Sequence, residues 1–267
     1  MKNVLLFAIL VSLIMACSPA DRQRLTFENS NEAIDKKTLL FQGQKEYDSL
    51  IAYIDTTREL DDFYTLEYSD THQNIKLVRG KLNQKKSVVM MEMEETYTKG
   101  IQIITDYYFS GSILIYAKQI IKDYSKKKDG FMEVFTYFGS NKKPIISASR
   151  MGNDEEELAN KPITVCKKTN FNPEEALNLV NQKGKYQTRF LGSLETENLK
   201  FIIVGTNGSP RVQSAIAYNK DFPIAVKLVE NEALYKNRLL SVEFTKVTGD
   251  DGFTFQGLTR IKILDEE

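Results

Sequence analysis

The feature that most constrains the fold is a series of segments in which apolar side chains recur at every second residue. Between residues 62 and 150 these segments are rich in β-branched and aromatic residues, and short turn-like pieces such as "NQKK" and "GSNKK" separate them. Alternate side chains of a β-strand point to opposite faces of a sheet, and such short links join antiparallel neighbours. The pattern predicts an antiparallel β-meander of about six or seven strands.

Two segments show how this sheet should be covered. In "VVMMEMEETY" one face should carry apolar side chains and the other Glu92 and Glu94; the apolar set is Val89, Met91, Met93 and Tyr97. In contrast, "ILIYAKQII" is apolar at both alternations, as expected for a central strand covered on both faces. An amphipathic helix is predicted from about Ala33 to Arg58, with Leu50, Ile51 and Ile54 on one side. This helix is the expected cover of one sheet face.

A second domain is predicted after the acidic stretch 152–162, "GNDEEELANKP", which we interpret as a solvated loop at the boundary. Asn172 should cap a helix that begins at Pro173, with Glu174 and Glu175 at its positive end. Further strand-like segments follow, including "PIAVKLV" at 223–229. The predicted class is mainly β, or α+β: a helix plus meander at 32–151, then a second antiparallel sheet or small barrel with one helix at 162–267.

The N-terminal segment has the pattern of a secretory signal. Val4 to Ala16 is a run of 13 residues interrupted only by Ser12, and Lys2 precedes it. As a helix the run would reach roughly 20 Å, short of the roughly 30 Å hydrocarbon core of a membrane. We therefore predict that residues 1–16 are removed as a signal peptide.

The stretch "LIMAC", ending at Cys17, resembles the lipobox of bacterial lipoproteins. The resemblance implies a diacylglycerol on the Cys17 thiol, cleavage before it, acylation of the new amine with a fatty acid such as palmitate, and a tether over residues 17–31. Ser18 after the cysteine implies an outer-membrane destination, with the periplasmic or the outer side left open. The pattern of an aromatic pair, a turn and an aliphatic strand ("YYFSGSILIYA") is similar to that of uncharacterised envelope lipoproteins of Bacteroidota.

Charge and motifs exclude several classes of function. The chain has 36 basic and 36 acidic residues, so its charge favours no nucleic-acid partner. His72 is the only histidine, which excludes two-histidine zinc sites, and the usual nucleophile and phosphate-loop motifs are absent.

Cys166 alternates with apolar neighbours and is interpreted as a small buried residue. Two SxxK matches, at Ser125 and Ser140, fall in turns. The acidic runs 153–157 and 250–251 lack the spacing of a calcium loop. We expect no cofactor, no metal and no catalytic residue.

Lysines in the predicted turns are the candidate binding residues. In a meander successive turns alternate between the two ends of the sheet, so Lys85, Lys86, Lys142 and Lys143 should lie at one end. Lys126–Lys128 should lie at the other end. The first four could contact an anionic surface, at about 1 kcal/mol for each lysine.

These observations favour a non-enzymatic binding or assembly role for an envelope lipoprotein, with an envelope protein or a glycan as partner. Two alternatives stay open. One is a carboxylate-based hydrolase of envelope or dietary polymers, because the spacing of two acids is set only by folding. The other is an inhibitor or immunity lipoprotein.

Overall fold

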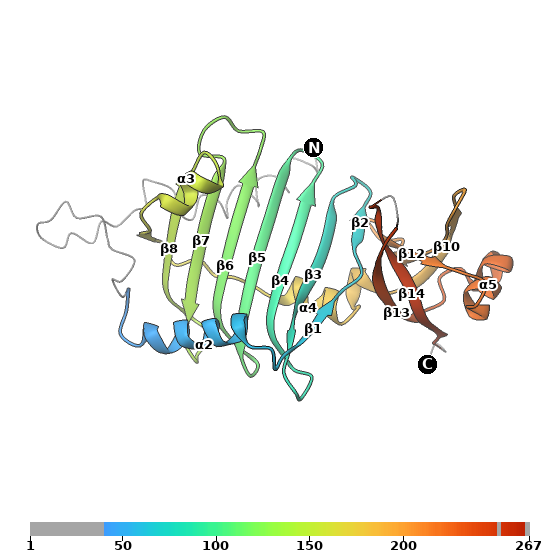
Figure 1. Cartoon of the computed structure of the whole chain (residues 1–267), viewed down its shortest axis with the longest axis horizontal. Helices are drawn as coiled ribbons and strands as arrows, with labels where there is room; N and C mark the ends of the chain where they lie inside the picture. The colour runs from blue at the N-terminus through green and yellow to red at the C-terminus, as the bar shows by residue number, and fades with distance from the viewer. Residues whose placement is uncertain (1–39, 250–251, 265–267) are drawn as a thin grey trace, which may run out of the picture. The chain divides into compact units, whose positions relative to one another are not determined.

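The structure, a computed structural model, describes residues 40–249 and 252–264 and confirms a mainly β protein with a few helices (Figure 1). The predicted signal peptide, the lipidation site Cys17 and the tether lie outside the described residues. No helix within the described part of the chain is long and apolar enough to cross a membrane.

The chain divides into two compact units that interleave in sequence. The first unit comprises the residues up to Phe63 together with Arg79–Pro173, and the second comprises Tyr64–Val78 and the residues from Glu174 onward. These bounds differ from the consecutive ranges 32–151 and 162–267 expected from the sequence. The acidic stretch after residue 152 stays in the first unit because its helix contacts the sheet there. Asp70 and Val212 pair as neighbours, which brings the early segment into the second unit.

The first unit contains the predicted antiparallel meander. Its strands follow one another in the order of the chain, and neighbouring strands from β4 to β9 pair antiparallel. The elements are α2 (Gln44–Thr56), β1 (Asp61–Tyr64), β3 (Ile75–Leu82, shared by both units), β4 (Val88–Tyr97), β5 (Ile101–Ser110), β6 (Ile113–Asp123), β7 (Phe131–Phe138), β8 (Pro144–Gly152), α3 (Glu155–Asn160) and β9 (Thr164–Cys166).

Helix α2 covers one face of this sheet, as the sequence predicts. Leu50, Ile51 and Ile54 pack against the cluster that contains Tyr108 and Ile115. Figure 1 shows α2 running across the strands at one end of the sheet. The predicted alternation along β4 is confirmed for Met91 and Met93, which are buried on the face opposite α2, whereas Val89 packs against the cluster beneath α2.

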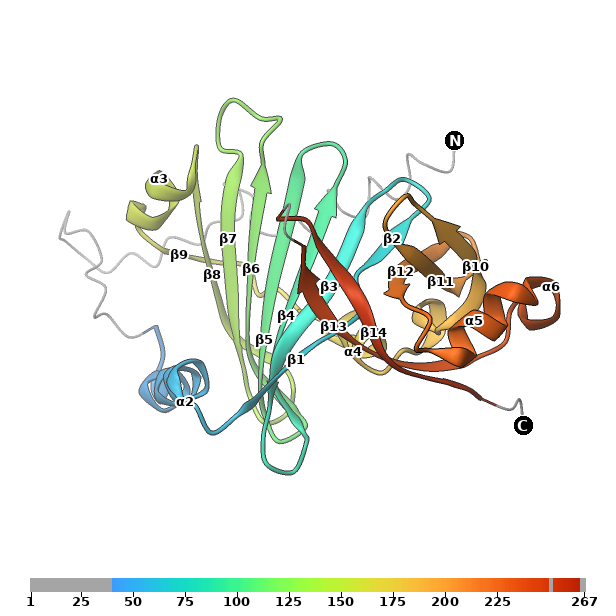
Figure 2. The same ribbon diagram turned by 45° about the vertical axis from the view of Figure 1, so that its right-hand side comes forward.

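The opposite face is crossed by the segment that follows β9 (Figures 1 and 2). The backbone N–H of Thr169 donates to Ser147 Oγ at 2.8 Å, and Thr136 Oγ1 donates to the Thr169 carbonyl at 3.2 Å. Further along, Tyr107 donates to the carbonyl of Asn172. The central strands β5 to β7 are therefore covered on both faces, as expected for "ILIYAKQII".

The acidic stretch interpreted as a solvated loop is a helix instead. Asp154 is the N-cap residue of α3, and its carboxylate accepts a 2.7 Å hydrogen bond from the backbone N–H of Glu157. Glu157 also forms an ion pair with Lys161, one turn later, at 2.7 Å. Acidic residues in the first turn stabilise a helix through its dipole, so the charge run acts here as a helix start.

The second unit is a smaller mixed sheet with helices beside it. Its pairing order is β10-β11-β12-β2, with β14 joined to β12 by a parallel pair and to β13 by an antiparallel hairpin. The sheet is not closed into a barrel. The elements are β2 (Tyr68–Asp70), α4 (Glu174–Val180), a 3-10 turn at Gly184–Tyr186, β10 (Arg189–Glu195), β11 (Lys200–Thr206), β12 (Val212–Tyr218), α5 (Pro223–Glu230), α6 (Glu232–Tyr235), β13 (Leu240–Thr248) and β14 (Thr254–Ile263).

The prediction of a strand at 223–229 is wrong, because this segment is helix α5. Pro223 occupies the first turn of α5, where its fixed φ angle and missing N–H suit a helix start. Ala225 and Leu228, three residues apart, are both fully buried, so the apolar residues that suggested a strand form one side of a helix. The second unit thus contains α4, α5 and α6 where one helix was expected.

Candidate functional site

The two predicted lysine turns lie at the same end of the first unit. Lys85 and Lys86 are in the β3–β4 turn, and Lys142 and Lys143 are in the β7–β8 turn, separated by an even number of strands. Both turns are at the lower end of the sheet in Figure 1, whereas the β6–β7 turn with Lys126–Lys128 is at the upper end. The four lysines therefore lie at one end of the sheet, as predicted, in two turns with strands β4 to β7 between them.

Both turns are held by an asparagine side chain. Asn83 Oδ1 accepts from the backbone N–H of Lys85 at 2.9 Å, and Asn141 Oδ1 accepts from that of Lys143 at 3.0 Å. Lys86 and Lys142 have positive φ angles of 59° and 61°, which only a few side chains adopt readily. The lysines thus sit on defined backbone turns.

The lysine side chains of these turns are exposed, and only Lys86 is paired. Its ammonium lies 2.6 Å from Asp61 Oδ2, and both side chains of this pair are more than half exposed. Lys85, Lys142 and Lys143 form no ion pair with any residue that the structure describes. Three exposed lysines at one end of the unit therefore have no ion-pair partner among the described residues.

Helix α2 connects the two lysine turns along this end. Near its start, Tyr47 donates to the carbonyl of Phe138, the last residue before the β7–β8 turn, at 3.0 Å. At its end, Lys81 Nζ donates to the carbonyls of Ile54 and Asp55 at 2.7 and 2.9 Å. Leu40 and Tyr47 both pack against a cluster of buried residues in β7 and β8, namely Phe135, Tyr137 and Ala148.

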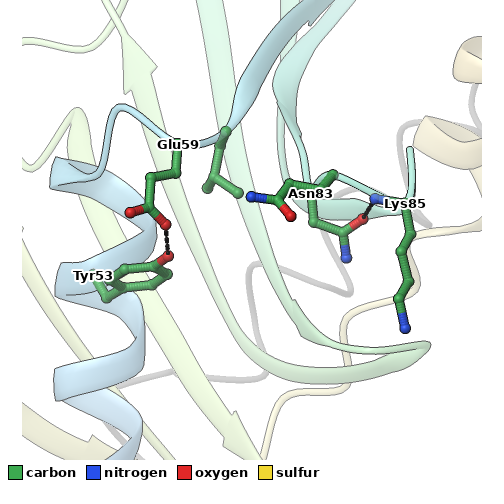
Figure 3. A pocket seen from close by; sticks show the side chains of 6 residues that line it. Tyr53, Glu59, Asn83 and Lys85 are labelled. Carbon is green, nitrogen blue, oxygen red and sulfur yellow. Dashed lines mark hydrogen bonds between the residues drawn. The ribbon is translucent and has the colours of Figure 1, made fainter.

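A pocket of about 290 Å³ opens beside the β3–β4 turn (Figure 3). Its lining residues come from three segments: α2, the link after it, and the turn. They are Tyr53, Glu59, Leu60, Asn83, Gln84 and Lys85. Figure 3 shows Tyr53 and Glu59 on one side and Asn83 and Lys85 on the other. The tyrosine hydroxyl donates a 3.0 Å hydrogen bond to Glu59 Oε2. Of these residues only Lys85 was a sequence candidate.

A second group of charges lies on the α2 side of the sheet, but its members neutralise one another. Ion pairs cross from strand to strand: Arg79 with Glu92, Lys118 with Asp106 at 2.9 Å, and Arg150 with Glu133 at 3.0 Å. Asp106 is 6% exposed, and this burial raises the pKa of its carboxyl. We assign these pairs a structural role, because each buried carboxylate already has a cation.

The remaining sequence candidates do not form a site. His72 is exposed in the β2–β3 turn, where its backbone N–H donates to Asp70 at 2.7 Å, and Cys166 is buried in β9. Ser125 donates to Asp123 at 2.6 Å. Asp250 and Asp251 lie outside the described residues. Within residues 40–249 and 252–264, no cluster of three or more His, Cys, Asp or Glu side chains is arranged to hold a metal ion.

No family model, no curated protein and no solved structure matches this chain.

Proposed function

We propose that this chain is a lipid-anchored protein of the bacterial outer membrane, with a non-catalytic role in binding or assembly at that surface. The lipobox-like "LIMAC" supports the anchor at Cys17. The observation that carries the proposal is that Lys85, Lys142 and Lys143 are exposed in two turns at the same end of the first unit. A lipid anchor at Cys17 would hold the first unit at the membrane, and the exposed lysines would favour the orientation in which this end faces an anionic leaflet.

The lipid anchor and the exposed lysines would then contact the same membrane surface. The two or three acyl chains expected at Cys17 would make the attachment stable, and basic residues close to an anionic leaflet would add about 1 kcal/mol each. Lys85, Lys142 and Lys143 are exposed and carry unpaired charge within the described chain. Helix α2 carries exposed charges of both signs, including Lys45 and Glu46, so we assign the attraction to the turns and not to the helix.

The pocket favours binding over hydrolysis. Carboxylate-based glycosidases use two acids that flank the scissile bond, and Glu59 is the one carboxylate among the residues that line this pocket. A hydrolase would need a second acid within reach of the same ligand. The pocket therefore supports recognition of a ligand without its cleavage.

The anchor is tested by metabolic labelling with a palmitate analogue. Label should be found in the parent protein and lost from Cys17→Ala. Equal label in both proteins would contradict the proposed anchor.

The orientation is tested on the intact lipoprotein in vesicles. A water-soluble amine-acylating reagent should modify Lys85, Lys142 and Lys143 less in vesicles of anionic phosphatidylglycerol than in neutral phosphatidylcholine. Lys127 and Lys128, exposed in the opposite turn, are the matched control and should react equally in both. Equal protection of the two turns, or none, would refute the proposed contact.

A further inference from the structure

We infer that the pocket beside the β3–β4 turn binds one ring of a neutral saccharide. Its volume of about 290 Å³ is at the lower limit of ordinary small-molecule sites. A ligand of one ring, or the end of a longer chain, suits a pocket of this size. The inference goes beyond the proposed membrane role because it concerns a different ligand and, apart from Lys85, different side chains.

The lining has both kinds of surface that a sugar ring needs. A pyranose has apolar C–H faces and a rim of hydroxyls that both donate and accept hydrogen bonds. Tyr53 is 49% exposed, and its ring, with Leu60, gives an apolar wall on which a C–H face can lie. Glu59 accepts hydrogen bonds, while the amides of Asn83 and Gln84 bring donors and an acceptor. Hydroxyls at the rim would thus meet partners of both types.

The charge of the pocket selects a neutral ligand. Glu59 and Lys85 carry opposite charges and line the same pocket, so their electrostatic potentials offset each other at its centre. A phosphate or carboxylate near Lys85 would also approach Glu59, and that repulsion offsets the attraction. A sugar hydroxyl can use either group, because it donates to the carboxylate and accepts from the ammonium.

The end of α2 and the backbone of the β3–β4 turn are held in place before any ligand arrives. Lys81 joins β3 to the end of α2 at 2.7 Å, and Lys86 joins the turn to Asp61 at 2.6 Å. Asn83 Oδ1 accepts from two backbone N–H groups of its own turn, those of Lys85 and Ser87, at 2.9 and 3.0 Å. These bonds hold both segments in place, and the side chains of Gln84 and Lys85 make no hydrogen bond within the described chain. Such preorganisation lowers the entropic cost of binding.

The test uses the full-length protein in detergent, with an array of neutral and acidic oligosaccharides and with methyl hexosides in saturation-transfer NMR. We expect binding of at least one neutral sugar. Tyr53→Ala and Glu59→Gln should each weaken it about tenfold, as for central contacts of a small site. Tyr53→Phe, which keeps the ring, should retain most of the affinity. The matched control Tyr124→Ala removes a tyrosine that is 60% exposed in the turn at the other end, and it should change the affinity less than about twofold.

Three results would overturn the inference: no neutral sugar binds, binding survives Tyr53→Ala, or only acidic sugars bind and Lys85→Gln abolishes their binding. Circular dichroism of each variant confirms that it is folded. The lysine-protection experiment does not depend on the sugar, so failure of the pocket and failure of the membrane contact are distinguishable.

Discussion

The hydroxyl of Tyr137 donates a 2.6 Å hydrogen bond to Asp48, a residue that lies 89 positions earlier on α2. Tyr108 makes the same kind of bond to Asp55, at 2.8 Å. Asp48 and Asp55 are seven residues apart, close to two helical turns, and so lie on one side of the helix. The two bonds attach α2 to β7 and to β5, respectively, along the face that covers the sheet.

Removal of either hydroxyl should therefore loosen α2. We expect Tyr137→Phe and Tyr108→Phe each to lower the free energy of unfolding by about 1–2 kcal/mol, because each deletes a hydrogen bond to a charged acceptor. The urea midpoint measures this, with an unchanged slope. Tyr124→Phe, whose side chain is 60% exposed, is the control. A midpoint equal to that of the control would show that the two bonds contribute nothing.

Alkaline pH should destabilise the same contact. Burial, and then the hydrogen-bonded aspartates, raise the pKa of both Tyr108 and Tyr137 above the ordinary value of 10.0. A group whose pKa is raised on folding contributes stability that is complete below the unfolded pKa and is lost as the pH rises above it. We expect the free energy of unfolding to fall between about pH 10 and about pH 12. The double variant Tyr108→Phe/Tyr137→Phe should lose less over that interval, and an equal loss would contradict this explanation.

Acid should affect the second unit through Glu175. This carboxylate accepts from Lys76, Lys185 and Tyr186 at 3.0, 2.7 and 2.7 Å. Burial opposes its ionisation, but the Lys76 charge and these hydrogen bonds outweigh burial and lower its pKa from 4.5 to about 2. The pH dependence runs in the opposite direction to that of the tyrosines. The stabilisation by Glu175 is complete above about pH 4.5 and is lost as the pH falls toward 2.

Glu175→Gln should flatten this acid dependence and lower stability at neutral pH. Denaturant unfolding at a series of acidic pH values measures both effects. Glu243→Gln, at an exposed ion pair with Arg260, is the matched control and should keep the parent's acid dependence. If the two variants behave alike, the Glu175 cluster does not set the acid stability.

The buried pair on the sheet face gives a further prediction. Asp106→Ala leaves Lys118 without its partner, and a broken buried pair costs several kcal/mol. We expect the free energy of unfolding to fall by about 3 kcal/mol, the lower end of the range for buried pairs, because the Lys118 side chain is still 31% exposed. Glu243→Ala at the exposed pair should cost less than about 1 kcal/mol. Thermal and urea unfolding measure both effects. Equal and small decreases in stability for the two variants would contradict the prediction.

The local sequence pattern alone predicted much of the first unit correctly. Leu50, Ile51 and Ile54 recur at helical spacing, and the alternation of Met91 and Met93 with glutamates follows directly from the pleat of a strand. The same patterns are ambiguous when a segment is short. "PIAVKLV" has branched residues that suit a strand, yet Pro223 and the buried positions three apart form a helix, and its tertiary contacts decide between them. The helix start at Asp154 was missed because acidic residues also suit a solvated loop.

The candidate site was predictable only in part. Turn order alone places Lys85 and Lys142 at one end, since antiparallel strands alternate in direction. The pocket has no local signature, because Tyr53 and Glu59 meet Asn83 only after α2 has packed across the sheet. The same holds for Asp48 and Tyr137, whose separation in sequence exceeds any short-range pattern.

Strand β3 belongs to both units, and this affects how the chain is assembled during synthesis. The ribosome releases residues 64–78 early, but their neighbour β12 begins only at Val212. Until then β2 has an open edge, which can pair with another chain. A product that stops after Pro173 would retain that edge permanently. Expression of either half alone would therefore yield a fragment that lacks part of its own unit or carries part of the other. The role of each unit is better tested by point substitutions in the intact chain.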